Sequence, residues 1–111
     1  MTSYQEMVTR VGVTEARIIK RVAERAVGFG WAVAVNDGEE GLVSRTLVLD
    51  DIFNGVGHTE ETHFHLWHDA SALDLGWSKV GWIWFVHGNE EDVVTDHSDN
   101  ERIEELMVGI Y

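Results

Sequence analysis

The first half of the chain alternates apolar and polar residues in a way that predicts a β-hairpin. Large and small apolar residues alternate over residues 31–35, and a second apolar stretch covers residues 42–46. The turn between them is made of asparagine, aspartate, glutamate and glycine, and glycine provides the positive φ angles that hairpin turns need. We therefore expect two antiparallel strands joined by an acidic turn.

Residues 62–68 predict a third strand whose two faces differ in chemistry. Side chains on a strand alternate between faces, so Phe64 and Leu66 share one face. The opposite face carries His63, His65 and Trp67. A loop at residues 69–79 is expected to follow.

Residues 80–86 predict a fourth strand, which is apolar on both faces. One face carries Trp82, Trp84 and Val86, and the other carries Ile83 and Phe85. This pattern is typical of a strand that is central in its sheet or covered on both sides. Acidic turn residues and a fifth strand at residues 93–96 are expected next.

Three segments have apolar residues at helical spacing. In residues 14–27 the pattern is strong, and Gly28 and Gly30 end it. Residues 49–56 predict a helix of about two turns, and residues 101–110 predict the last helix.

Two candidate capping boxes mark helix starts. Ser98 with Glu101 is expected to cap the last helix, and Ser3 with Glu6 is the corresponding pair near the N-terminus. Because Gly12 follows soon afterwards, we expect residues 1–12 to form a frayed turn or a short helix.

Together these elements predict a single α+β domain over residues 1–111. It would contain a mainly antiparallel sheet of about five strands, covered by the first and last helices, with the order α-β-β-α-β-β-β-α. We expect Trp31, Trp82 and Trp84 to lie mostly in the core.

The amino-acid composition restricts how the fold can be stabilised and where in the cell the protein is expected. The chain has no cysteine and no proline, so disulfides and cysteine-bearing zinc sites are excluded, and the fold must depend on packing. The N-terminus lacks the pattern of a secretion signal, and the longest apolar run is far too short to cross a membrane. We therefore expect a cytoplasmic protein.

The net charge is −12, and the two signs are unevenly distributed. Residues 1–25 carry five basic and three acidic groups, whereas the remaining 86 residues carry 3 basic and 17 acidic groups. A negative field of this kind repels nucleic acid and anionic membranes and attracts basic protein surfaces. Direct binding to nucleic acid or to a membrane is therefore not expected.

Three segments, residues 30–40, 80–89 and 92–106, carry a resemblance to a known family. They resemble small acidic proteins encoded by tailed bacteriophages and prophages, in which a G-[YW]-x-[IV]-x-V-x-D-G-E-E hairpin precedes an x-V-x-G-N turn and a D-V-[IV]-x-D-[HY]-[ST]-D-N segment. The sequence departs from this pattern after Glu40, where family members continue with an aromatic residue and a basic run. The resemblance implies an accessory role for a phage or mobile element in a bacterial cytoplasm, and it names no chemistry.

Histidines supply the main candidate for metal chemistry. His63 and His65 would lie on one face of a strand, roughly 6.5 Å apart along the chain, and such a pair can ligate a divalent metal if a third group converges. Glu60, Glu61 and His87 are candidates for that third ligand. The alternative is that these histidines are exposed and pair with neighbouring acids.

Other polar clusters have simpler explanations. Asp96, His97 and Ser98 are residue types of a hydrolytic triad, but triad members are brought together by the fold and Ser98 is expected to cap a helix. We therefore predict no catalytic residues. The acidic pairs in the two turns are expected to be solvated; they are Glu39, Glu40, Glu90 and Glu91.

Two further features indicate an interaction surface. Trp67 and Trp77 are expected near the surface, where a tryptophan beside acidic groups is typical of a protein-binding hot spot. Arg17, Arg21 and Arg25 recur at i+4 steps on the first confident helix. They form either a solvated face or a docking stripe for the protein's own acids, for a second subunit or for a partner.

These observations favour a non-enzymatic protein-interaction module that binds a partner with a basic surface. The predicted surface consists of Glu39, Glu40, Glu90, Glu91, Asp92, Trp67, Trp77, Arg17, Arg21 and Arg25. A sharper version is a mimic of DNA charge that acts as an anti-defence factor. The alternatives are a metal-binding protein or metal-dependent enzyme centred on His63 and His65, and an assembly protein that forms a homodimer through the arginine stripe.

Overall fold

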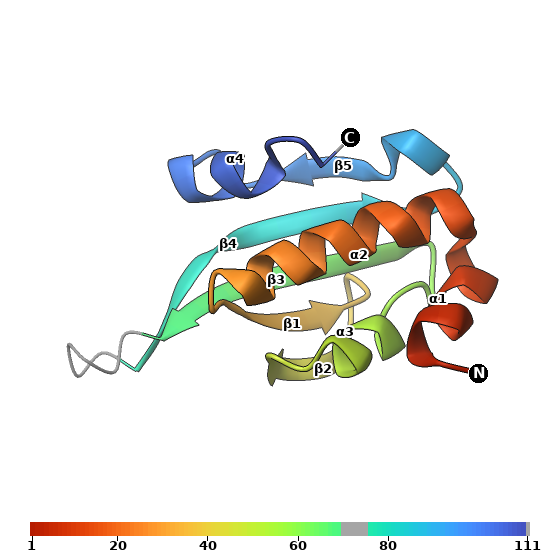
Figure 1. The fold of residues 1–111 in the computed structure, drawn as a ribbon, viewed down its shortest axis with the longest axis horizontal. Helices are drawn as coiled ribbons and strands as arrows, with labels where there is room; N and C mark the ends of the chain where they lie inside the picture. Colours follow the sequence, from red (N-terminus) through yellow and green to blue (C-terminus); the bar gives the residue numbers. More distant parts are fainter. Residues whose placement is uncertain (70–75, 111) are drawn as a thin grey trace.

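The computed structural model, which describes residues 1–69 and 76–110, contains one five-stranded sheet. Every neighbouring pair of strands in it is antiparallel (Figure 1). In spatial order the strands are β2 (Gly41–Thr46), β1 (Ala32–Asn36), β3 (Glu61–Asp69), β4 (Trp77–Val86) and β5 (Val94–His97). The predicted α+β class and antiparallel sheet are confirmed.

Helices pack against one face of this sheet, and α2 (Val13–Gly28) runs along it (Figure 1). The other helical elements are α1 (Ser3–Val11), α3 (Leu49–Asn54), the short 3₁₀ helix η2 (Glu90–Asp92) and α4 (Glu101–Met107). Within the part of the chain that the structure describes, no helix combines the length and the apolar character needed to cross a bilayer.

The core forms between α2 and one face of the central strands, as strand alternation predicts. Phe64 and Leu66 of β3 and Ile83 and Phe85 of β4 are each fully buried. From α2 the core receives the side chains Ala16, Ile18, Ile19, Val22, Ala23 and Ala26. The helical layer and the sheet are therefore packed around one shared core.

The N-terminal segment is more ordered than the sequence predicts. Residues 3–11 form α1, whose Met7 is fully buried, so the chain begins with two helices and the order is α-α-β-β-α-β-β-β-α. Gly12, with a φ of 90°, separates α1 from α2 in a conformation that favours glycine. The capping box uses Thr2 and Gln5, one residue before the predicted pair of Ser3 and Glu6.

The last helix also has a different cap from the predicted one. Asn100 is the N-cap residue of α4, and its side chain accepts a hydrogen bond from the Ile103 N–H at 3.0 Å. The Ser98 hydroxyl instead accepts from the Trp82 N–H at 2.7 Å, on strand β4. Ser98 does not cap α4 because its backbone pairs with β4: the Ser98 N–H donates a hydrogen bond to the Trp82 carbonyl.

The sequence predicts a loop over residues 69–79 as the connection between β3 and β4. Asp69 and residues 77–79 are in fact strand residues, because β3 and β4 continue to pair as far as Asp69 and Trp77. The prediction for residues 70–75 lies outside the described residues.

We expect substitution of Gly81 to test how tightly α4 packs on β4. A Cβ atom there would lie 2.6 Å from Ser98 Oγ and 2.7 Å from Ile103 Cγ1, so Gly81→Ala should lower the free energy of unfolding by about 1–3 kcal/mol. Denaturant unfolding measures this change. Gly41→Ala in β2 is the matched control, since no atom lies within 4 Å of its added Cβ, and an equal loss in both variants would contradict the packing.

Candidate functional site

A buried carboxylate, imidazole and hydroxyl form a hydrogen-bonded chain that crosses from α2 to the sheet. Glu15 Oε1 lies 2.9 Å from His87 Nδ1, and His87 Nε2 lies 2.7 Å from Thr62 Oγ1. The second oxygen of Glu15 accepts from the N–H groups of Gly88 and Glu90 at 2.9 and 3.0 Å. Glu15 is only 2% exposed, yet both of its oxygens are satisfied.

The hydrogen-bonded series Glu15, His87 and Thr62 has the residue types of a nucleophilic triad, but its geometry indicates a structural role. Thr62 is 1% exposed, and its hydroxyl also accepts from the Gly57 N–H at 3.0 Å. A substrate would have no route to that oxygen. These hydrogen bonds hold the turn after β4 against the first turn of α2. Within that turn Glu90 adopts a positive φ of 50°.

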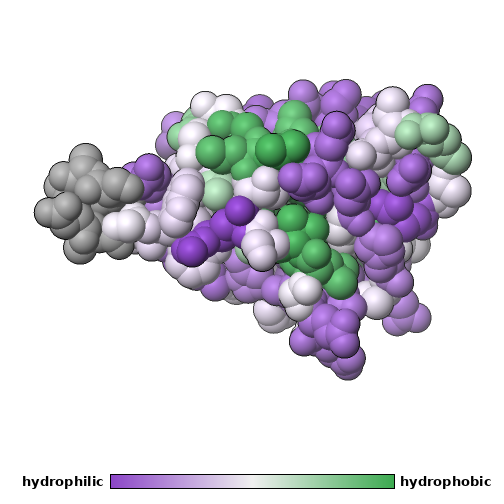
Figure 2. All heavy atoms as spheres, turned by 90° about the horizontal axis from the view of Figure 1, so that it is seen from below, coloured by the Kyte–Doolittle hydropathy of each residue, from purple (hydrophilic) through white to green (hydrophobic). Residues whose placement is uncertain are grey.

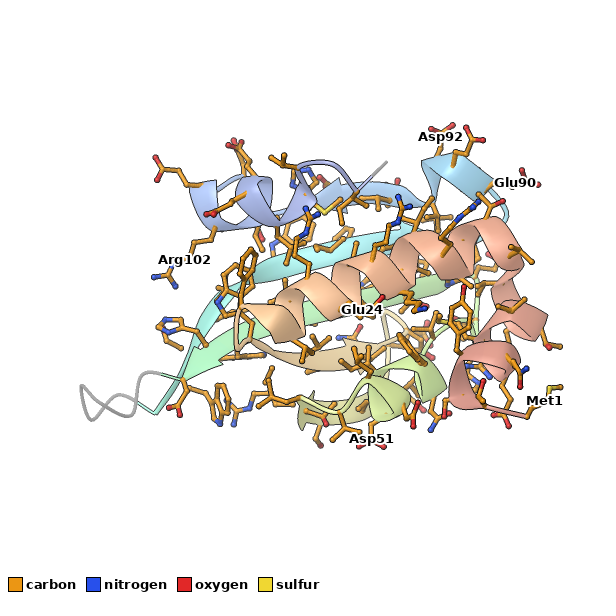
Figure 3. The ribbon with its side chains drawn as sticks, in the orientation of Figure 1. Met1, Glu24, Asp51, Glu90, Asp92 and Arg102 are labelled. Carbon is orange, nitrogen blue, oxygen red and sulfur yellow. The ribbon has the colours of Figure 1, made fainter. Side chains whose placement is uncertain are left out.

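Carboxylates from three turns gather at one end of the sheet. The β1–β2 turn, the start of β3 and the β4–β5 connection meet there, because Asn36 pairs with His63 and Glu61 pairs with Val86. The group, which we call the acidic end, consists of Asp37, Glu39, Glu40, Glu60, Glu61, Glu90, Glu91 and Asp92. Figure 3 shows Glu90 and Asp92 projecting from η2 away from the sheet.

A hollow of about 420 Å³ lies within the acidic end, between the β1–β2 turn and the start of β3. Backbone N–H groups of Glu40 and Glu39 donate to Asp37, and these bonds lower the pKa of the Asp37 carboxyl below its ordinary value. The residues that line the hollow are Asp37, Gly38, Glu39, Thr59, Glu60 and Glu61. The acidic end therefore presents a concave, negatively charged surface to a partner.

The sheet face opposite the helices is aromatic, and we call it the open face. Trp82 and Trp84 of β4 point onto it with ring centroids 4.7 Å apart, and His63 of β3 stacks on Trp84 at 4.7 Å. Trp84 is 36% exposed. The expectation that Trp82 and Trp84 lie mostly in the core is therefore wrong, because helices cover only the other face of β4.

The far end of the open face is basic. The guanidinium of Arg45 lies 5.0 Å from the ring centroid of Trp67 and 5.9 Å from that of Trp77, and the Lys79 ammonium lies 5.7 Å from Trp67. Such cation–π contacts hold both charges beside the indole rings. Trp77 is 36% exposed and so lies near the surface, as predicted, whereas Trp67 is only partly exposed and its Nε1 atom is buried. Arg45 lies beside both rings and Lys79 beside Trp67.

The two predicted metal ligands share the open face, and no third ligand joins them within the part of the chain that the structure describes. His63 and His65 lie on adjacent same-face positions of β3, and Glu61 is 3.7 Å from His63 Nε2. Among the described residues, no group of three histidine, cysteine, aspartate or glutamate side chains is arranged to hold a metal ion. Burial, reinforced by the charge of Lys79, lowers the pKa of His65 below its ordinary value.

Two residues of the arginine stripe bind the protein's own C-terminal segment. Arg21 donates to the Ile110 carbonyl at 3.1 Å, and Arg25 donates to the carbonyls of Leu106 and Val108. Cations at a helix C-terminus satisfy carbonyls that the helix leaves unpaired. Arg17 is exposed and lines a hollow with Glu91, so the stripe serves mainly to dock α4 and the segment after it against α2.

The residues Asp96, His97 and Ser98 do not form a triad. His97 Nδ1 lies 2.9 Å from the Ser98 carbonyl oxygen, and Asp96 Oδ1 accepts from the His97 backbone N–H. Asp96 pairs with Trp84 and is exposed beside the open face. The structure gives these three residues roles in strand pairing.

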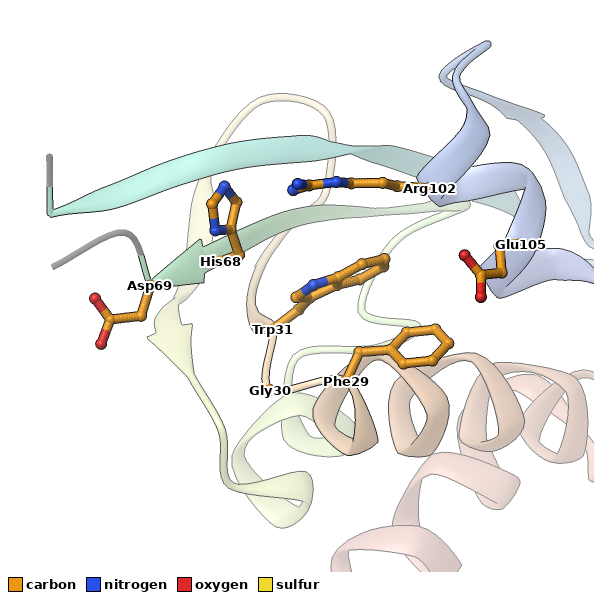
Figure 4. Close-up of a pocket in the computed structure, with 7 residues that line it drawn as sticks. All are labelled: Phe29, Gly30, Trp31, His68, Asp69, Arg102 and Glu105. Carbon is orange, nitrogen blue, oxygen red and sulfur yellow. The ribbon is translucent and has the colours of Figure 1, made fainter. Parts of the chain in front are cut away.

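A second hollow, of about 440 Å³, lies where α2 ends near α4 (Figure 4). Trp31 lines it, with its ring centroid 4.9 Å from that of Phe29, and is partly buried against the edge of the core. The remaining lining residues are Gly30, His68, Asp69, Arg102 and Glu105. Charges of both signs face this hollow, so it favours no single class of ligand.

Comparisons with protein-family models, with curated proteins and with solved structures found no match. The resemblance to phage-encoded proteins therefore stays a prediction, and the residues and their geometry carry the functional argument.

We expect loss of the Glu15 carboxylate to be strongly destabilising. Glu15→Leu would leave the N–H groups of Gly88 and Glu90 and the partly buried His87 ring without their acceptor in a largely enclosed site, at a cost of about 2–5 kcal/mol in the free energy of unfolding. Chemical denaturation measures this loss. Glu24→Leu on the exposed face of the same helix is the control, and similar behaviour of the two variants would argue against the network.

We expect protonation of His65 to destabilise the fold. The pKa of His65 is lowered in the folded protein, so the unfolded chain takes up this proton first as the pH falls from about 7. The contribution of His65 to stability is therefore present above the unfolded pKa and is lost as pH falls toward the folded pKa. NMR titration of the His65 ring measures its folded pKa, which Lys79→Gln should raise; an unchanged midpoint would contradict the assigned cause.

Proposed function

We propose that the protein is a non-enzymatic interaction module that binds a basic surface of a partner protein through its acidic end. The observation that carries the proposal is the gathering of carboxylates from three separate turns at one end of the sheet. Except for half-buried Asp37, the residues of this group are exposed and available to a partner.

The shape and charge of the acidic end fit this role. Its hollow of about 420 Å³ is large enough to receive a basic side chain, and Glu39 and Glu60 line it from different segments. A concentrated negative field raises the rate of encounter with a basic partner and fixes its orientation, although each exposed ion pair adds little to affinity. Specificity would come from the arrangement of several carboxylates.

The residues that could support other functions are less favourably arranged. His63 stacks against Trp84, and His65 is partly buried between its neighbours, so neither ring is presented with a third ligand among the described residues. The Thr62 hydroxyl contacts the His87 ring, which in turn contacts Glu15, but Thr62 is 1% exposed and is therefore closed to a substrate. Metal-dependent catalysis therefore has less support than binding by charge.

The proposal predicts binding that weakens with salt and with loss of the turn carboxylates. A triple variant, Glu90→Gln with Glu91→Gln and Asp92→Asn, removes three negative charges from η2 without changing side-chain size. Its affinity for a basic partner, isolated from bacterial lysate with the purified protein as bait, should fall about tenfold or more in a titration at low ionic strength. In the DNA-mimic form of the proposal, duplex DNA competes for the same partner.

Two controls make this test specific. A matched variant, Glu24→Gln with Asp50→Asn and Asp51→Asn, removes the same charge from exposed positions outside the acidic end and should bind as the wild type does. Binding that is independent of salt, or equally weakened in both triple variants, would contradict the proposal.

A further inference from the structure

The open face of the sheet is an aromatic surface that the described residues leave without a covering layer. The buried core draws on only one face of β3 and β4, while Trp77 and Trp84 are each 36% exposed. Antiparallel sheets commonly place polar residues on an uncovered face, and tryptophan is instead typical of the buried centre of a protein interface. This surface therefore has the composition of a contact that is completed by another molecule.

Charge is polarised along the strands of the open face. At one end, Arg45 and Lys79 lie against Trp67, and at the other end Asp96 pairs with Trp84 in a row that also contains His63. The row of Trp82 and His65 lies between the two ends. Two tryptophan-containing clusters of opposite charge are thus separated by a neutral aromatic centre.

We propose that the open face is the interface of a symmetric homodimer, in which two sheets pack face to face with their strands running in opposite directions. The two-fold axis would lie between the sheets, across the strands, near the row of His65 and Trp82. This arrangement places the cluster of Trp67 and Lys79 of one copy over the cluster of Trp84 and Asp96 of the other. In an isologous interface the same contact occurs twice, so both charged clusters are matched.

The size of the face is sufficient for such a contact. The five strands of the sheet, about 4.8 Å apart and with about seven residues rising about 3.3 Å each, define roughly 500 Å² of surface per copy. Two copies would bury roughly 1,000 Å², which is close to the lower limit for specific interfaces. Aromatic side chains at the centre and charges at both ends are the usual arrangement of these contacts.

Pairing through the β2 edge of the sheet is less favourable than pairing through the face. The register between β1 and β2 shifts twice, and irregularities of this kind disfavour addition of another strand at the β2 edge. Viewed from the β2 side, the surface shows separate apolar patches among hydrophilic side chains (Figure 2). The exposed apolar residues of β2 and the segment after it are Leu42, Leu47 and Val48.

A charge-exchange experiment tests the dimer directly. Light scattering coupled to size-exclusion chromatography should give the wild type a mass of twice 12.6 kDa. Lys79→Glu alone and Asp96→Lys alone should each raise the dimer dissociation constant about tenfold or more, because each change makes two like-charge contacts in a homodimer. An equimolar mixture of the two variants should recover the dimer, because the new carboxylate at position 79 of one copy then faces the new ammonium at position 96 of the other.

The matched control is Arg17→Glu, which makes the same change of charge on the exposed side of α2 and should remain dimeric. Thermal unfolding by circular dichroism confirms that each variant is folded. The proposal is overturned if the folded wild type is monomeric at every concentration. It is also overturned if the wild type is a dimer that neither Lys79→Glu nor Asp96→Lys weakens, or if only Arg17→Glu weakens the dimer. Failure of the mixture to recover the dimer also overturns it. This result is independent of partner binding by the acidic end.

Discussion

The buried carboxylate of Glu15 is the constraint on which the arrangement of the molecule depends. A charge of this kind is tolerated in a protein interior only when its oxygens are saturated with donors, and here the donors come from His87 and from the backbone of the turn after β4. Because Glu15 belongs to α2 and Thr62 to β3, one network connects the helical layer to β3 and to the turn after β4. It holds together the end of the sheet at which the acidic turns meet.

The hydrogen bonds of the Glu15 carboxylate help to explain why the acidic side chains of η2 remain at the surface. Glu15 accepts hydrogen bonds from the N–H groups of Gly88 and Glu90, which fixes the path of the turn. The side chains of Glu90 and Asp92 then project outward (Figure 3). The η2 part of the acidic end is thus anchored to α2 by hydrogen bonds. Like charges held close together are costly for the isolated protein and favourable for a partner of opposite charge.

The two faces of the sheet have different roles. One face buries aliphatic and phenylalanine side chains beneath the helices, and the other presents indoles and imidazoles with a basic and an acidic end. The arginine stripe belongs to the first role, since Arg21 and Arg25 complete the C-terminal region of α4. In the proposed homodimer, two acidic ends would be presented, one from each copy.

Local pattern in the sequence determined most of the elements and separated the two faces of β3. Alternation assigned Phe64 and Leu66 to one side and His63, His65 and Trp67 to the other, because side-chain direction on a strand follows from backbone geometry alone. Only the tertiary structure decided which apolar face would be covered, and so left Trp82 and Trp84 on the open face. It also decided that Asn100 rather than Ser98 caps α4, that Glu15 is buried at an apolar position of α2, and that three distant turns form one acidic end. These outcomes depend on strand order and on contacts between residues far apart in the chain, which no local pattern contains.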